Sequence, residues 1–490
     1  MNDRTVADAG RFEVRAFGKD ILVYAAGNGI LLLFGFLQAL IIPKYLSVAG
    51  YGYWQLFNLY SNYVGILALG FLDGLLVRWA GKDLNQIGGE IKPAIRFLVL
   101  EQLAVIIPLG LITFFLLHPP LQWIGLMIFV YAFIMNLATF FIFTAQAIRR
   151  FWLLTALNVV RGLVFLLLVV LLFTSGHLEY HYVIVVFLVS FVLFIIALAV
   201  RYRRYLWGDH SPAPSPVSLG RKNINTGIFI LLGNFVFLIF WTLDRLLVSS
   251  FFAIEQFAVY AFASAVAQIA VTFIGAIASV LFPHLSAAAP EQRTRTYQVG
   301  KCALILCWAA FLGAYFPLTA LIEFYLPHYT GSLPIIKILF GSLGFFCIVR
   351  IMQVTYFKMY GRQRQYLLYG ISVLAFAVLL ALTAIKMLGT LESVAIVMLI
   401  SFFVWYIINS LSLKSVTGES GRKIGKDLMI MGCYFVAFCL ASYTLDWLLA
   451  GMIVYYAFFL LITWIFLLRE SKELLAVVKA LITKSGKGEA

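Results

Sequence analysis

The sequence has few charged residues and few chemically reactive ones. Charged residues make up 12% of the 490 and apolar residues 63%, a composition that soluble globular domains do not have. The five cysteines all fall inside apolar runs, without CxxC or metal-ligand spacing, as is typical of small core residues. The six histidines include no pair at metal-binding spacing. We therefore expect no disulfide framework, no metal site and no bound cofactor.

Two further signals are missing. There is no P-loop, so a pump driven directly by ATP is not expected. The first 20 residues do not form a cleavable secretion signal, because they are polar, carry four basic residues and precede a full-length apolar run. Residues 1–20 are therefore predicted to be an uncleaved, cytoplasmic amphipathic lead-in.

Long apolar runs dominate the rest of the chain. A helix that crosses a bilayer needs about 20 residues, and fourteen segments reach that length. The sequence thus predicts an all-α integral membrane protein with about 14 transmembrane helices and both termini in the cytoplasm. The predicted spans are 21–43, 53–77, 94–117, 121–147, 153–174, 180–200, 225–250, 257–282, 298–325, 333–357, 366–388, 390–413, 427–447 and 449–468.

The distribution of basic residues sets the predicted orientation. All but seven of the 36 lysines and arginines fall in the termini or in alternate loops, which is the positive-inside pattern of membrane proteins. The formal charge of +15 therefore indicates topology and anionic headgroups, not a nucleic-acid partner. We predict a multi-pass protein of the inner, cytoplasmic membrane. The exceptions are Lys44, Lys337 and Lys386 on the opposite side, and Arg96, Arg161, Arg245 and Arg350 within spans.

Two stretches of the same layout indicate an internal duplication. Phe34–Phe57 aligns with Trp241–Ser264 as a long helix, a short turn and another long helix, with Tyr53 opposite Tyr260. A linker rich in Pro and Ser separates the first six spans from the next six. Two related halves favour a transporter that works by alternating access. The predicted domains are a lobe at 21–200, a cytoplasmic linker at 201–224, a lobe at 225–413, two added helices at 427–468 and a basic cytoplasmic tail at 469–490.

Ordered motifs over residues 20–365 resemble a known transporter family. They are PKYLSVAGYGYWQL with GFLDGLLVRWAG, then WTLDRLLVSSFFAIEQFAVYAFA, then ASVLFPHLSA with LIEFYLPHYTGSLPIIKIL. In order and spacing they resemble the oligosaccharide flippases, the Wzx-like polysaccharide exporters of the multidrug/oligosaccharidyl-lipid/polysaccharide (MOP) superfamily; Ala253 stands where that family commonly has Gly. The resemblance implies two pseudo-symmetric six-helix lobes around a central cavity, as in MATE transporters. It also implies transfer of an isoprenoid-diphosphate-linked oligosaccharide to the outer leaflet.

Such a substrate carries a diphosphate, which can cross the membrane only in a water-filled cavity that offers cations. Arginine suits this role because its planar fork can hold phosphate oxygens in bidentate fashion. Arg161 in the fifth span and Arg350 in the tenth lie at similar predicted depth, one in each lobe. We predict that both bind the diphosphate; the alternative is that each pairs with a carboxylate or caps backbone carbonyls.

The neighbours Asp244 and Arg245 present a similar choice. On a helix they point about 100° apart, so we expect them to pair with other helices more than with each other. Arg245 is either a further phosphate-binding residue or part of an ion pair that locks two helices together. Further cavity candidates, each with a purely packing or hydrogen-bonding alternative, are Asn28, Gln38, Asn158, Asn234 and Trp241.

Three carboxylates are candidates for a coupling ion, H⁺ or Na⁺. Secondary transporters place such groups within membrane spans, and the candidates here are Asp73, Glu101 and Asp244. The expected partners are a lipid-linked oligosaccharide, membrane lipids and either a glycan polymerase or glycosyltransferases.

Other functions remain open at this point. A peptidoglycan-precursor flippase and a cation-coupled multidrug antiporter share the same superfamily. A membrane-embedded glycan polymerase or ligase belongs to another class, and it normally needs a large external loop; the predicted outer connections are short.

Overall fold

The computed structural model describes residues 27, 29–148, 150–207, 215–286, 293–444 and 447–486. Within these residues every regular element is a helix, which confirms the predicted all-α class. The chain divides into two compact units, Met1–Thr242 and Leu243–Ala490.

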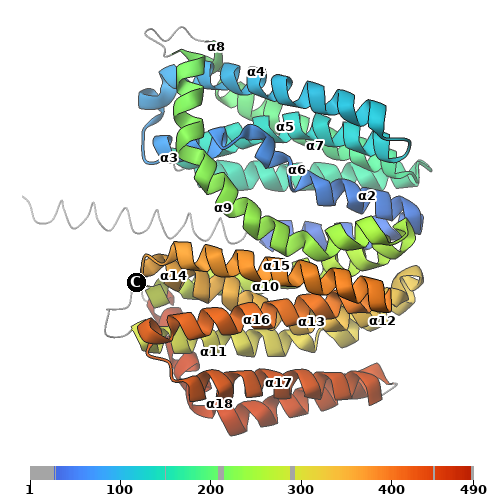
Figure 1. The fold of residues 1–490 in the computed structure, drawn as a ribbon, viewed down its shortest axis with the longest axis vertical. Coiled ribbons are helices and arrows are strands. Elements are labelled where there is room, and N and C mark those ends of the chain that lie inside the picture. The colour runs from blue at the N-terminus through green and yellow to red at the C-terminus, as the bar shows by residue number, and fades with distance from the viewer. Residues whose placement is uncertain are drawn as a thin grey trace, which may run out of the picture. The chain divides into compact units, whose positions relative to one another are not determined.

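The N-terminal unit, Met1–Thr242, is built from antiparallel membrane-length helices (Figure 1). Helix α4 packs on α5, α5 packs on α7, and α6 packs on α7. Its first described apolar helix is Gly29–Tyr45. Its other elements are α2 (Val48–Ser61), the 3-10 helix η1 (Val64–Ala68), α3 (Phe71–Trp79), α4 (Leu84–Leu116), α5 (Leu121–Ala147), α6 (Phe151–Thr174), α7 (Tyr180–Arg201), α8 (Arg203–Trp207) and most of α9 (Pro216–Phe251).

The C-terminal unit, Leu243–Ala490, is also a helical bundle. Helix α13 packs on α16 and α10, and α15 packs on α16. After the end of α9, its elements are α10 (Ile254–Ser286), α11 (Arg293–Leu312), α12 (Tyr315–Tyr325), the 3-10 helix η3 (Pro327–Ser332), α13 (Leu333–Cys347), the π-helix η4 (Ile348–Gln353), α14 (Val354–Met359), α15 (Gln363–Leu388), α16 (Leu391–Thr417), α17 (Gly421–Thr444) and α18 (Leu448–Gly486).

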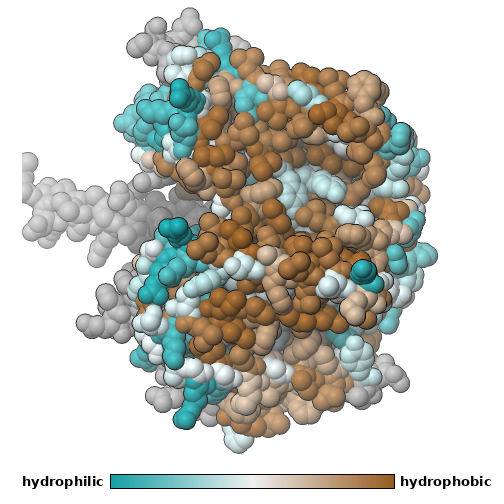
Figure 2. All heavy atoms as spheres, viewed as in Figure 1, coloured by the Kyte–Doolittle hydropathy of each residue, from teal (hydrophilic) through white to brown (hydrophobic). Residues whose placement is uncertain are grey.

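The long helices are apolar in the middle and polar near their ends. Figure 2 shows hydrophobic side chains over the middle of the helices in each unit and hydrophilic ones near the helix ends. Large apolar side chains are exposed on these helices, such as Leu171 at 64% and Leu379 at 68%. Water would disfavour that exposure, whereas hydrocarbon does not. The protein is therefore a multi-pass membrane protein.

The predicted count of fourteen spans is not confirmed. Among the described residues, 12 helices are long and apolar enough to cross a membrane, or 13 if a bent pair is one span. The Gly29–Tyr45 helix at the first predicted span is shorter, and residues 21–26 and 28 lie outside the described part of the chain.

The second span is bent, although the sequence analysis predicted one continuous helix at 53–77. Segments Val48–Ala68 and Phe71–Trp79 meet at 65°. Between them, Leu69 and Gly70 adopt left-handed backbone angles, with φ of 49° and 82°. A leucine seldom adopts positive φ, so local propensity gives no hint of this break.

Helix α9 joins the two units. Its first part lies against α3, because a Cβ on Gly74 would overlap the backbone of Asn223 and one on Gly227 would overlap that of Gly70. The division into units consequently falls within α9, after Thr242, and not in the 201–224 linker. The duplication and the domain bounds based on it stay predictions.

The last two helices pack on the bundle of the C-terminal unit. Tyr455 of α18 donates a hydrogen bond to the carbonyl oxygen of Ala309 in α11, and the neighbouring Tyr456 donates to that of Ala310 at 3.1 Å. Gly313 leaves room for the Tyr456 ring, since a Cβ there would overlap it. The added helices are thus part of this unit and not a separate attachment.

Candidate functional site

Arg161 is a half-buried cation in a membrane-spanning helix of the N-terminal unit. Its guanidinium carbon lies 4.2 Å from the centre of the Phe191 ring of α7, within the range of a cation–π contact. Its Nε is buried and has no hydrogen-bond partner. Among the described residues no ion pair includes Arg161. The predicted alternative of a carboxylate partner is therefore not seen in this part of the chain.

The helix that carries Arg161 is fixed by close packing. Gly162 faces the Gly29–Tyr45 helix, and a Cβ there would overlap the ring of Phe34. Asn158, one turn earlier, donates to the carbonyl oxygen of Leu154 at 2.9 Å. The Asn158 side chain thus binds its own helix, while its Oδ1 remains an acceptor.

Arg350 lies in the C-terminal unit, on the π-helix Ile348–Gln353. The extra residue in a π turn shifts the side-chain register, and such turns often mark functional positions. Arg350 is exposed, while its neighbours Val349 and Met352 are buried. The apolar run 333–357 had predicted an ordinary α-helix here. The prediction that Arg161 and Arg350 face one cavity stays a prediction.

Asp244 and Arg245 contact each other, and Asp244 also pairs with another helix, as the sequence predicted. Arg245 Nε lies 3.9 Å from Asp244 Oδ1, which also accepts the backbone N–H of Arg245 at 2.8 Å. The other oxygen, Oδ2, accepts the hydroxyl of Tyr260 in α10 at 3.1 Å. Because Asp244 is only 6% exposed, this arrangement fits the helix-locking alternative, here between α9 and α10.

Glu101 belongs to a hydrogen-bonded chain in the N-terminal unit. Its Oε2 accepts from Gln102 Nε2 at 2.7 Å, and Gln102 Oε1 accepts from Asn136 Nδ2 at 2.8 Å. Glu101 Oε1 is buried without a partner. Glu101 was predicted from the sequence, but its two amide neighbours were not, since uncharged amides give little signal in an apolar run.

The remaining predicted site residues differ in position and in exposure. Asp73 lies in the first turn of α3, where a carboxylate is favoured by the helix dipole. Asn234 is exposed on α9, whereas Gln38 and Trp241 are half-buried. Asn28 lies outside the described residues. No group of three or more His, Cys, Asp and Glu side chains in the described ranges is arranged to hold a metal ion.

A buried ion cluster in the C-terminal unit was missed altogether. Lys301 Nζ of α11 lies 2.6 Å from Glu419 Oε1 and 2.5 Å from Asp427 Oδ2. The side chains of Lys301 and Glu419 are 2% and 1% exposed, and that of Asp427 is 9% exposed. The two acids stand alone among basic residues at 414–426, and that isolation was the available signal.

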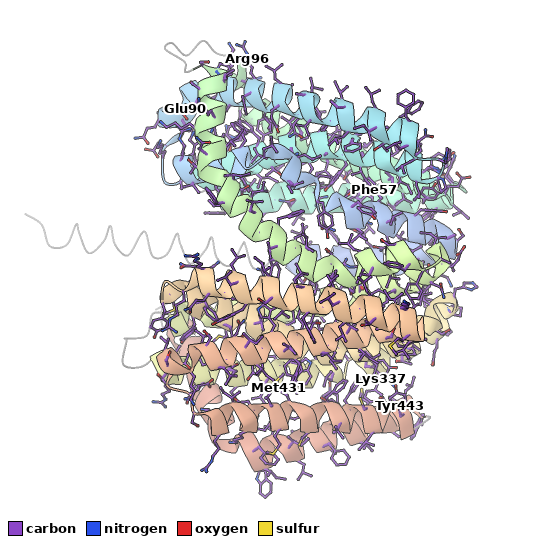
Figure 3. All side chains as sticks on the ribbon, viewed as in Figure 1. Phe57, Glu90, Arg96, Lys337, Met431 and Tyr443 are labelled. Carbon is purple, nitrogen blue, oxygen red and sulfur yellow. The ribbon has the colours of Figure 1, made fainter. Side chains whose placement is uncertain are left out.

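Two further polar contacts tie helix ends together. At one end of the N-terminal unit, Glu90 accepts from Trp79 Nε1 at 2.8 Å and pairs with Arg78, while Arg96 is exposed nearby on α4 (Figure 3). In the C-terminal unit, Lys337 Nζ of α13 lies 3.3 Å from the ring centre of Tyr443 in α17 (Figure 3).

Residues 17–289 match the family model described as "Polysaccharide biosynthesis protein". The chain belongs to this family. No curated protein sequence matches the chain.

Solved structures show which fold this family member adopts. The lipid II flippase MurJ, in an inward closed conformation, has a TM-score of 0.68 at 12% identity, covering 91% of this chain and 98% of that one. An inward-facing multidrug resistance MATE family transporter of the MOP superfamily has a TM-score of 0.58 at 15% identity, covering 81% and 96%. The Vibrio cholerae MATE transporter VcmN has 0.52 at 15% identity, covering 82% and 97%. The family model confirms the predicted polysaccharide family, and the solved structures show that the chain shares the fold of MurJ and the MATE transporters.

Proposed function

We propose that this protein is a transporter, not an enzyme, that moves an isoprenoid-diphosphate-linked oligosaccharide from the cytoplasmic to the outer leaflet of the inner membrane. The substrate is the repeat unit of an O-antigen, capsule or exopolysaccharide. Transfer proceeds by alternating access, with both termini in the cytoplasm. Membership of a polysaccharide biosynthesis family and a fold shared with a lipid II flippase support this proposal.

The surroundings of Arg161 are the observation that carries the proposal. A guanidinium inside a membrane helix is costly, and such groups usually mark a substrate path or a partner charge. The described residues offer Arg161 an aromatic ring and no carboxylate. A cation held in this way keeps its planar donors for an anion, and a diphosphate accepts two parallel hydrogen bonds from such a fork. Arg350 is proposed as a further phosphate contact, and a glycan polymerase or glycosyltransferases as partners.

The substrate is tested by deleting the gene in its host and identifying the lipid-linked intermediate that accumulates on the inner leaflet. We expect a diphosphate-linked oligosaccharide, with loss of the corresponding surface glycan. Accumulation of the peptidoglycan precursor would point to a precursor flippase instead. Unchanged lipid intermediates with a loss of drug resistance would point to an antiporter.

A further inference from the structure

The break in the second span interrupts the α-helical hydrogen bonding of the backbone inside the membrane. At η1 the chain turns through a 3-10 helix and then two left-handed residues, Leu69 and Gly70. Unpaired carbonyls cost several kcal/mol in hydrocarbon. A break of this kind persists only where side chains satisfy the freed groups.

Two amides from other helices donate hydrogen bonds to carbonyl oxygens at the break. Gln102 of α4 donates to the carbonyl oxygen of Leu67 at 3.0 Å, and Asn136 of α5 donates to that of Val64 at 3.2 Å. Gln102 is 1% and Asn136 is 1% exposed. The break is thus held by a buried pair of amides.

Both protons of each amide are in use. Gln102 Nε2 donates to Leu67 and to Glu101 Oε2, while Asn136 Nδ2 donates to Val64 and to Gln102 Oε1. An amide nitrogen has only two protons, so the chain has one fixed direction, from Asn136 through Gln102 to the Glu101 carboxyl group.

Glu101 ends this chain with one open position. Its Oε1 is buried and accepts no hydrogen bond. In the described part of the chain, no cation lies within ion-pair distance of its carboxyl group. A bare carboxylate in such surroundings is costly, and binding one proton at the open oxygen removes the charge.

We propose that Glu101 is a proton-binding site that controls the break in the second span. The proton adds to Oε1 and converts the carboxylate to a neutral carboxyl group; on release, the carboxylate regains its charge and draws the Gln102 amide toward it. Because the same amide nitrogen holds the Leu67 carbonyl, the charge on Glu101 is transmitted to the break. The use of this proton to drive export rests on the proposed function, whereas proton binding does not.

A metal ion fits the site poorly. Sodium and other hard cations need several oxygen ligands, whereas the carbonyls of Val64 and Leu67 already accept amide protons and one carboxylate oxygen remains. Among the described residues, the charged groups on the surrounding elements form no ion pair with Glu101. Arg96 of α4 is exposed; Tyr63 bonds Thr242; Tyr131 of α5 packs on aromatic rings; Asp73 is in the first turn of α3.

Proton binding can be tested on the purified full-length protein with dicyclohexylcarbodiimide, which adds to protonated carboxyl groups in apolar surroundings. Mass spectrometry should find the adduct on Glu101, with a rate that falls about tenfold per pH unit above the transition. Glu101→Gln should remove it. Glu90 is the matched internal control, because Arg78 and Trp79 hold its carboxylate, and it should not react.

Several outcomes would overturn the assignment. Absence of the adduct on Glu101 at every pH would contradict proton binding, and protection by NaCl at constant pH would indicate sodium instead. Loss of surface glycan in an Arg161 variant together with an unreactive Glu101 would leave the proposed function intact and reject only this inference.

Control of the break needs a second measurement. Hydrogen exchange of the amides at residues 63–70 should match between the wild type and Glu101→Gln at low pH, because glutamine mimics the neutral carboxyl group. At high pH the wild type alone should exchange differently. Equal exchange at all pH values would show that Glu101 does not control the break.

Discussion

Replacing Lys301 with methionine should destabilise the C-terminal unit more than any exposed charge change. The ammonium group lies 2.6 Å and 2.5 Å from two carboxylates, and all three side chains are at most 9% exposed. Methionine fills similar space but leaves Glu419 and Asp427 without their cation. Removing one partner of a buried ion pair costs about 3–5 kcal/mol.

The expected size of the effect can be stated as a melting shift. For a unit of this size, 1 kcal/mol corresponds to roughly 2–4 °C, so Lys301→Met should lower the melting temperature by roughly 6–20 °C. The assay is thermal unfolding of the detergent-solubilised protein, followed by fluorescence.

Two further variants separate this mechanism from a general loss of packing. Lys426→Met is the matched control, since Lys426 pairs with Glu470 at 3.6 Å with both side chains partly exposed; exposed pairs contribute about 0–1 kcal/mol. The triple variant Lys301→Met, Glu419→Gln, Asp427→Asn removes the stranded charges and should regain much of the loss. Equal effects of Lys301→Met and Lys426→Met, or no recovery in the triple variant, would refute the reasoning.

Three other predictions follow from close contacts and topology. Gly227→Ala should destabilise the N-terminal unit by about 1–3 kcal/mol, because its Cβ would overlap backbone at the start of α3, whereas Gly233→Ala on the same helix meets open space; equal thermal stability of the two would contradict this. A double-mutant cycle of Lys337→Met and Tyr443→Leu should give a coupling of about 0.5–2 kcal/mol, and no coupling would show that the cation–π contact contributes nothing. A single Cys within residues 201–222, in a Cys-free background, should resist an impermeant thiol reagent added to intact cells; labelling from outside would reverse the predicted orientation.

The helical class and most spans could be predicted because hydrocarbon imposes a simple length and polarity rule on each segment. Runs such as Tyr180–Arg201 satisfy that rule without tertiary information. The bend in the second span could not, because Leu69 has no local preference for positive φ. That bend depends on Gln102 and Asn136, which come from other helices.

The candidate site was likewise predictable only in part. Arg161 stands out because it interrupts an apolar run, and the structure confirms that it lies half-buried within a spanning helix. The register of Arg350 was not predictable, since a π turn leaves no mark in the sequence. The Lys301 cluster joins residues 118 positions apart, so its members look like ordinary interfacial charges until the fold brings them together.

The claim that Arg161 binds the diphosphate is tested most directly by transport in reconstituted vesicles. Wild-type protein should move a diphosphate-linked oligosaccharide lipid between leaflets. Arg161→Ala should abolish this movement, and Arg161→Lys should retain only part of it, because an ammonium group lacks the planar fork. Arg96→Ala, which removes an exposed arginine of another span, should transport normally. Wild-type transport rates in folded Arg161→Ala would contradict the account.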